Sequence, residues 1–127
     1  MNESRHFNKA MRIEHSLQSL DVEHFEAVIE GTMLAGTHWF NILLHRANIL
    51  GENADAMHAE FLSVGARRKI AVLLAEPLAA LDEIEALRTT HVRGDMPDGA
   101  GAARRALACL AVLRGQALAG ARAEPPG

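Results

Sequence analysis

Apolar residues recur at three- and four-residue spacing along almost the whole chain of 127 residues. This spacing puts side chains on one face of an α-helix, and no stretch shows the two-residue alternation of a strand. Hydrophobic residues make up 49% of the chain, enough to bury a single core in a domain of this size. The pattern predicts an all-α fold, an antiparallel up-down four-helix bundle, with one domain over residues 1–119 and a flexible tail over 120–127.

The first predicted helix covers about residues 4–19, and the second covers about residues 21–50. Asp21 is a suitable N-cap for the second helix, because its carboxylate can accept hydrogen bonds from the free N–H groups of the first turn. Gly51 is placed to end that helix in the left-handed conformation. The short break between the two helices predicts that they are neighbours in space.

The third predicted helix runs from a cap at Asn53 or Asp55 to about Thr90, with Pro77 in its middle. Pro77 either kinks one long helix or starts a new one, and we favour a continuous, bent helix because the apolar phase is nearly kept. A loop rich in Gly, Pro and Asp follows over residues 91–101. The fourth helix covers about residues 102–119, with an inward-facing stripe of Ala103, Leu107, Leu110, Leu113 and Ala117.

Small residues form a strip on the second helix at four-residue spacing: Ala27, Gly31 and Ala35. A glycine inside a helix costs about 1 kcal/mol relative to alanine, so its presence indicates the close approach of another helix. That helix belongs either to the same chain or to a second copy across a dimer face. The three residues, together with Trp39, are therefore interface candidates.

The composition limits the partners and the compartment. The net charge of −3 gives no overall attraction to nucleic acid or to an anionic membrane, and the one basic run, Arg67–Lys69, is typical of a solvated face. Cys109 is the only cysteine and lies in an apolar stripe, so we expect its thiol to be buried. A single cysteine forms no disulfide within the chain, and we expect a cytoplasmic protein. Eleven arginines to two lysines, with abundant alanine, suggest a GC-rich bacterial genome.

Seven histidines raise the possibility of a metal site. Carboxylate-bridged metal bundles use an acid and a histidine three residues apart on the same helix face. Three pairs fit that spacing: Glu3 with His6, Asp21 with His24, and Asp55 with His58. All three lie at predicted helix starts, where the acid is better explained as a cap or dipole partner. We therefore assign no metal ligand and expect no cofactor.

A polar stripe runs along the second predicted helix: His38, Asn41, His45 and Asn48. We interpret it first as the solvated face of a long helix. The alternative is a groove lining between two protomers, where histidines would titrate near neutral pH as bases or switches must. These residues, with Arg93 further along the chain, are the candidate ligand-binding residues.

From Ala79 onward the chain has a distinctive order: a long helix ending in Leu-Arg and then His, next a loop, then an Ala-rich helix with leucines at helix spacing. It resembles the back half of HEPN-type (higher eukaryotes and prokaryotes nucleotide-binding) four-helix domains. The resemblance implies an up-down bundle that is commonly dimeric, and ribonuclease members of the family use an Arg, a short polar spacer and a His near the dimer groove. The nearest match here is Arg88-Thr-Thr-His91, whose spacer is shorter than in the family's active motif. Arg88 and His91 are the candidate catalytic residues, or alternatively cations that cap the end of the third helix.

These observations favour a small bacterial helical bundle that acts as an interaction or ligand-binding module. We expect a homodimer, with a possible protein partner, no membrane association and no catalysis by this chain alone, because no complete catalytic constellation is present. The alternative is a HEPN-like ribonuclease or toxin-system component acting at a dimer groove, the one case that implies a nucleic-acid partner. A second alternative is a metal-binding bundle around His38 and His45.

Overall fold

The structure, a computed structural model, describes residues 1–51, 54–55 and 63–123, and in these residues all regular structure is helical. The all-α prediction is confirmed. The helices are α1 (Glu3–Leu17), α2 (Phe25–Arg46), α3 (Val64–Leu73), α4 (Ala75–Leu87), the short π-helix η2 (Arg88–Arg93) and α5 (Gly99–Ala123).

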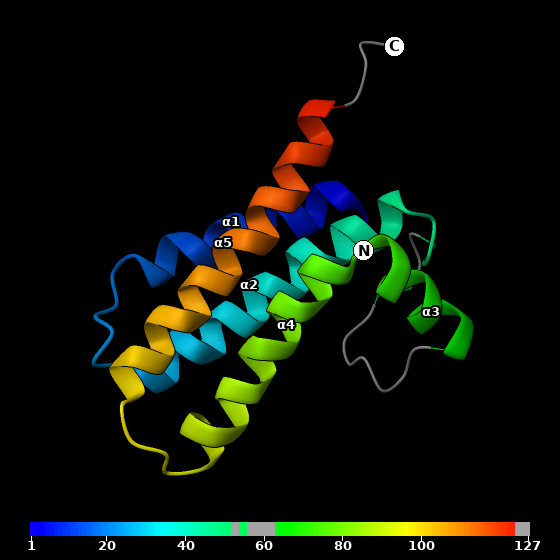
Figure 1. Cartoon of the computed structure of the whole chain (residues 1–127). Coiled ribbons are helices and arrows are strands. Elements are labelled where there is room, and N and C mark those ends of the chain that lie inside the picture. The colour runs from blue at the N-terminus through cyan, green and yellow to red at the C-terminus, as the bar shows by residue number, and fades with distance from the viewer. Residues whose placement is uncertain (52–53, 56–62, 124–127) are drawn as a thin grey trace.

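The α2 helix occupies the centre of the arrangement. It packs against α1, α4 and α5, and α4 also packs against α5 (Figure 1). The α3 helix lies to one side, where it contacts α4. The core therefore surrounds α2, and the residues near its C-terminal end lie where α1 begins.

The core contains the large apolar side chains of the central helices, which are fully buried: Ile29, Trp39, Leu44, Ile84, Leu110 and Leu113. The predicted inward stripe of the last helix is confirmed, since four of its five residues are buried and Leu107 packs against the core. The indole Nε1 of Trp39 donates a 2.6 Å hydrogen bond to Glu14 Oε2, so the polar atom of this core anchor has a partner. Cys109 is a buried free thiol, as predicted.

Both predicted ends of the second helix are wrong. Asp21 lies in the preceding turn, where its Oδ1 accepts from the N–H of Glu23, and α2 starts only at Phe25. At the other end, Asn48 and not Gly51 takes the left-handed conformation, with φ of 56°. The N–H of Ile49 then bonds Leu44 O and that of Asn48 bonds His45 O, the two hydrogen bonds of a Schellman motif.

The prediction of a continuous third helix is also wrong. The chain breaks at Leu74, whose φ of −131° and ψ of 39° end α3 and begin α4. Pro77 lies in the first turn of α4, where its missing N–H removes no intrahelical bond. Ser63 caps α3 by accepting from the N–H of Ala66, and the predicted cap at Asn53 lies outside the described residues.

The predicted loop over residues 91–101 is shorter than expected. The helical path continues from α4 through η2 to Arg93, and α5 begins at Gly99, capped by Asp98, whose Oδ1 accepts from the N–H of Gly101. Only residues 94–98 connect the two. At its far end, α5 continues to Ala123, past the predicted boundary of the tail.

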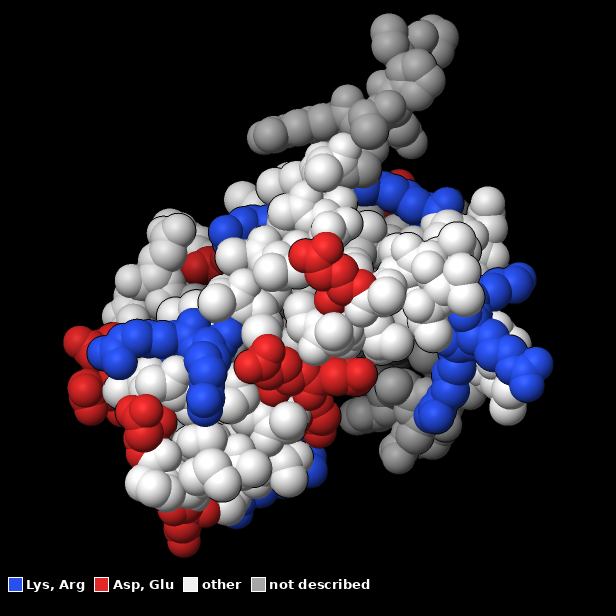
Figure 2. All heavy atoms as spheres, viewed as in Figure 1, with Lys and Arg blue, Asp and Glu red and all other residues white. Residues whose placement is uncertain are grey.

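Charged side chains are spread unevenly over the surface. Figure 2 shows basic side chains gathered over α3, where Arg67, Arg68 and Lys69 are all exposed, and acidic side chains nearer the middle of the same face. In the part of the chain described here, no helix is both long and apolar enough to cross a membrane.

Candidate metal centre

Two histidines and one carboxylate from three separate segments meet beside the C-terminal end of α2. His6 Nε2 lies 2.8 Å from Asp55 Oδ1, and His45 Nε2 lies 3.0 Å from the same oxygen. One ligand atom from each of the three residues can be chosen so that all lie within 4.8 Å of one another. At this spacing the three atoms can reach a single ion placed between them.

Each of the three residues is positioned by a different part of the fold. His6 sits on the inner face of α1 and is only 2% exposed, while His45 lies in the last turn of α2 with its side chain 4% exposed. Asp55 follows the Schellman turn and is 21% exposed at its side chain. The antiparallel packing of α1 on α2 brings the start of the first helix to the end of the second (Figure 1). Asp55 lies within hydrogen-bond distance of both histidines.

The second nitrogen of each histidine also has a fixed partner. His6 Nδ1 lies 2.9 Å from Nδ1 of His38, and His45 Nδ1 lies 3.1 Å from the backbone oxygen of Leu50. Histidines that bind metals almost always donate their other N–H to an acceptor, which fixes the tautomer and the ring orientation. Both imidazoles in this cluster therefore have the outer partner that a metal ligand needs.

The nitrogens of His6 and His45 face mostly oxygen atoms that can only accept a hydrogen bond. A carbonyl oxygen and a carboxylate oxygen only accept, so both nitrogens of His45 require either a proton or a cation opposite their oxygens. Asp55 Oδ1 faces Nε2 of two different histidines, while its Oδ2 lies 3.1 Å from the amino group of Met1. A metal cation near Asp55 Oδ1 would replace protons on both Nε2 atoms at once.

Burial and charge shift the pKa values of this cluster in opposite directions. Burial lowers the pKa of His6 and that of His38, which keeps both imidazoles neutral and able to use a lone pair. Burial alone would raise the pKa of Asp55, but hydrogen bonds from His6, the Met1 amino group and His45 outweigh it and bring this pKa down to about 2. A neutral imidazole and an ionised carboxylate are the forms in which these side chains bind metals.

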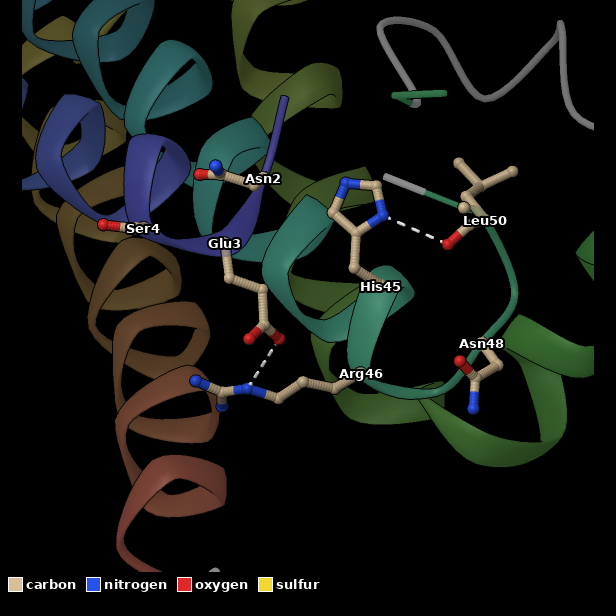
Figure 3. Close-up of a pocket in the computed structure, with 8 residues that line it drawn as sticks. Asn2, Glu3, Ser4, His45, Arg46, Asn48 and Leu50 are labelled. Carbon is tan, nitrogen blue, oxygen red and sulfur yellow. Dashed lines mark hydrogen bonds and ion pairs between the residues drawn. The ribbon is translucent and has the colours of Figure 1, made fainter. Parts of the chain in front are cut away.

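A cavity of about 680 Å³ opens beside His45, between the first residues of α1 and the end of α2. Figure 3 shows the His45 ring at its wall, with Nδ1 directed at Leu50 O, and Arg46 below it paired with Glu3. The Arg46 Nε lies 3.0 Å from Glu3 Oε1. Solvent therefore has a path to the edge of the cluster, as an exchangeable ion would require.

The predicted polar stripe divides into different environments. His45 belongs to the cluster and His38 contacts it through His6. Asn41 is buried at 1% exposure and donates from Nδ2 to Thr37 O. The interpretation of a solvated face is therefore wrong for Asn41 and His45. Asn48 is exposed at the rim of the cavity, and Arg93 is exposed at the end of η2.

The sequence prediction did not bring His6 and Asp55 together, and it explained Asp55 as a helix cap or dipole partner. The acid-and-histidine pairs that drew attention to them are not the relevant pairing, because His6 contacts Asp55 and not its neighbour Glu3, which pairs with Arg46. His58, the expected helix partner of Asp55, lies outside the described residues. Although it lies near the start of α1, the side chain of His6 is buried.

Arg88 and His91 have separate partners. The guanidinium of Arg88 donates from Nε to Glu30 Oε1 at 2.7 Å, an ion pair that joins α2 to the end of α4 and raises the pKa of Arg88. His91 is buried in η2 at 4% exposure, and its Nδ1 lies 2.7 Å from Thr90 Oγ1. In this arrangement Arg88 serves an ion pair between helices and His91 lies inside the fold.

Three of the four interface candidates serve packing within the chain. Ala35 and Trp39 are fully buried, and a Cβ added at Gly31 would overlap Leu17 of α1. The close helix approach predicted from the small-residue strip is therefore that of α1. Ala27 is exposed.

No protein-family model matches this chain, and neither a curated protein nor a solved structure matches it. The resemblance to HEPN-type domains and the homodimer stay predictions.

Proposed function

We propose that the protein is a helical metal-binding module that holds one divalent transition-metal ion between His6, His45 and Asp55. The observation that carries this proposal is the convergence of two imidazole Nε2 atoms on one carboxylate oxygen, at 2.8 and 3.0 Å. The sequence analysis favoured a ligand-binding module and kept a metal-binding bundle as an alternative. The geometry of the three side chains supports the metal-binding alternative best.

The ligand set favours zinc or a similar ion over calcium or magnesium. Two imidazole nitrogens with one carboxylate oxygen suit zinc, cobalt or nickel, whereas calcium and magnesium prefer oxygen ligands alone. Zinc bound by three protein ligands usually completes its shell with a water molecule or with substrate. The cavity beside His45 would supply that water.

We propose that α1, α2, α4 and α5 form the up-down four-helix bundle expected from the sequence, with α3 as an appendage. In such bundles, metal ligands project inward from facing helices. His6 and His45 would fit this pattern, since α1 and α2 pack together and both side chains are almost fully buried. The third ligand would come from the segment after α2.

The proposal is tested by titrating metal-free protein with Co²⁺, whose visible absorption reports nitrogen and oxygen ligands in low-symmetry coordination. We expect saturation at about one ion per chain for the wild type and a loss of affinity exceeding about a hundredfold for His45→Ala. The matched control is His24→Ala, because His24 is exposed and lies outside the cluster. Wild-type protein that leaves the Co²⁺ spectrum unchanged would contradict the proposal, as would equal binding by the two variants.

A further inference from the structure

His38 stands next to the proposed ion site without belonging to its first shell. Its Nδ1 faces Nδ1 of His6, while the atom of His6 that faces Asp55 is Nε2. The two nitrogens of an imidazole ring point in different directions, so His38 and Asp55 contact separate sides of His6. His38 therefore contacts the site through His6.

The contact between the two Nδ1 atoms determines which nitrogen of His6 carries the proton. At 2.9 Å it is a hydrogen bond, so one nitrogen must donate and the other must accept. With an ion on Nε2, His6 has its only proton on Nδ1 and donates it. His38 must then accept through an unprotonated Nδ1 and keep its own proton on Nε2.

The same arrangement recurs at the second histidine of the site, with a different acceptor. His45 Nδ1 faces the backbone oxygen of Leu50, which can only accept, so Nδ1 is protonated and the Nε2 lone pair is directed to the ion position. The backbone oxygen of Leu50 and the imidazole of His38 thus each accept the Nδ1 proton of one histidine. Of these two acceptors, only His38 can be altered by mutation without changing the backbone.

We propose that His38 is a positioning residue, which accepts the Nδ1 proton of His6 and so directs the Nε2 lone pair of His6 to the metal ion. This inference rests on the proposed metal site. It assigns to a half-buried histidine of α2 a role in metal affinity that needs no contact with the ion. Partners of this kind typically contribute 10- to 100-fold to metal affinity.

Two substitutions separate the acceptor from the volume of the side chain. His38→Asn keeps an acceptor, because the amide Oδ1 takes the place of Nδ1 at the same distance from the backbone. His38→Leu fills similar space with no acceptor. Thr37→Val is the control for disturbance of α2, since it removes only the neighbouring hydroxyl, which donates to Met33 O.

The measurement is the Co²⁺ dissociation constant of each metal-free variant, with its unfolding midpoint measured in the absence of metal. We expect His38→Leu to weaken binding by about 10- to 100-fold, and His38→Asn and Thr37→Val to stay within about threefold of the wild type. Should His38→Leu fail to fold, His38→Gln replaces it and is expected to weaken binding about tenfold, because its acceptor lies one bond too far along the side chain.

The outcomes distinguish the two proposals. If the wild-type protein binds no Co²⁺, the proposed metal site is wrong. If the wild type and His38→Leu bind Co²⁺ with equal affinity, the metal site is supported and the positioning role of His38 is wrong. Equal loss in His38→Asn and His38→Leu, with a changed Co²⁺ spectrum, identifies His38 as a direct ligand and also overturns the positioning role.

Discussion

His6 is a buried polar side chain with every nitrogen partnered, in a helix that exposes most of its surface. Burying an imidazole without partners costs free energy, and both nitrogens of His6 have partners within 2.9 Å. Among the described residues, no buried side-chain nitrogen or oxygen lacks a hydrogen-bond partner. The buried histidines among these residues are thus held by specific contacts, and these contacts fix the positions of the ligand atoms at Asp55.

Gly115 offers a test of local helix energetics away from the site. It is exposed inside α5, and a Cβ added there would meet no atom within 4 Å. Gly115→Ala should raise the free energy of unfolding by about 0.5–1 kcal/mol, because alanine loses less backbone entropy in a helix. Urea unfolding followed by the fluorescence of the single tryptophan measures the change.

The opposite sign is expected at Gly94, where an added Cβ would lie 2.7 Å from Thr90 O. Gly94→Ala should lower the free energy of unfolding by about 1–3 kcal/mol, because the backbone must move to relieve the overlap. If Gly94→Ala stabilised the protein as Gly115→Ala is expected to, the packing of Gly94 against η2 would be wrong.

Cys109 should react slowly with alkylating agents at neutral pH. Burial, the hydrogen bond of the thiol to Glu83 Oε2 and the charge of Glu83 raise the pKa of Cys109 to about 11. Because the thiolate is the reactive form, alkylation at pH 8 should be at least about a hundredfold slower than for an ordinary exposed cysteine, and should accelerate about tenfold per pH unit up to that pKa.

The control is Glu83→Gln, which removes the negative charge beside the sulfur and should lower the pKa of Cys109. Faster alkylation of this variant at pH 8 is the expected result. A rate for the wild-type thiol that levels off below pH 9 would contradict this account.

The end of α2 depends on one residue in the left-handed conformation. Asn48 has φ of 56°, and the hydrogen bonds of the Schellman motif close the helix around it. Asn48→Ala should lower the free energy of unfolding by about 1 kcal/mol, because a Cβ without a local polar partner disfavours this conformation. Asn48→Gly should be neutral or slightly stabilising, and chemical unfolding of both variants measures the difference. Equal effects of the two would argue against the Schellman ending.

Apolar spacing predicted the helices well because the 3.6-residue period is set by the backbone within each segment. It could not predict where they end, because Asn48 competes with Gly51 for the left-handed position and Leu74 breaks a helix whose apolar phase continues beyond it. The site was predictable only in part. His38 and His45 share a helix face, and so the sequence indicated them, whereas His6 and Asp55 reach them through packing between distant segments.

Metal binding should stabilise the folded chain, because the proposed ligands come from α1, α2 and the segment after α2. A ligand that binds only the folded state stabilises it by about 2.7 kcal/mol at a concentration of 100 Kd. Thermal unfolding with zinc at that level should therefore show a Tm raised by roughly 10 °C. The Tm of Asp55→Asn should respond much less, since it lacks the carboxylate that both histidines face. An equal rise for both proteins would place the ion elsewhere.

Equilibrium dialysis of the metal-free protein against Zn²⁺, with zinc and protein measured on both sides of the membrane, tests whether this chain is a metal-binding module. We expect about one tightly bound ion per chain in the wild type and in His24→Ala, and almost none in a double variant of His6→Ala and His45→Ala. A folded wild-type protein that retains no zinc, or a double variant that retains as much as the wild type, would contradict the proposed site.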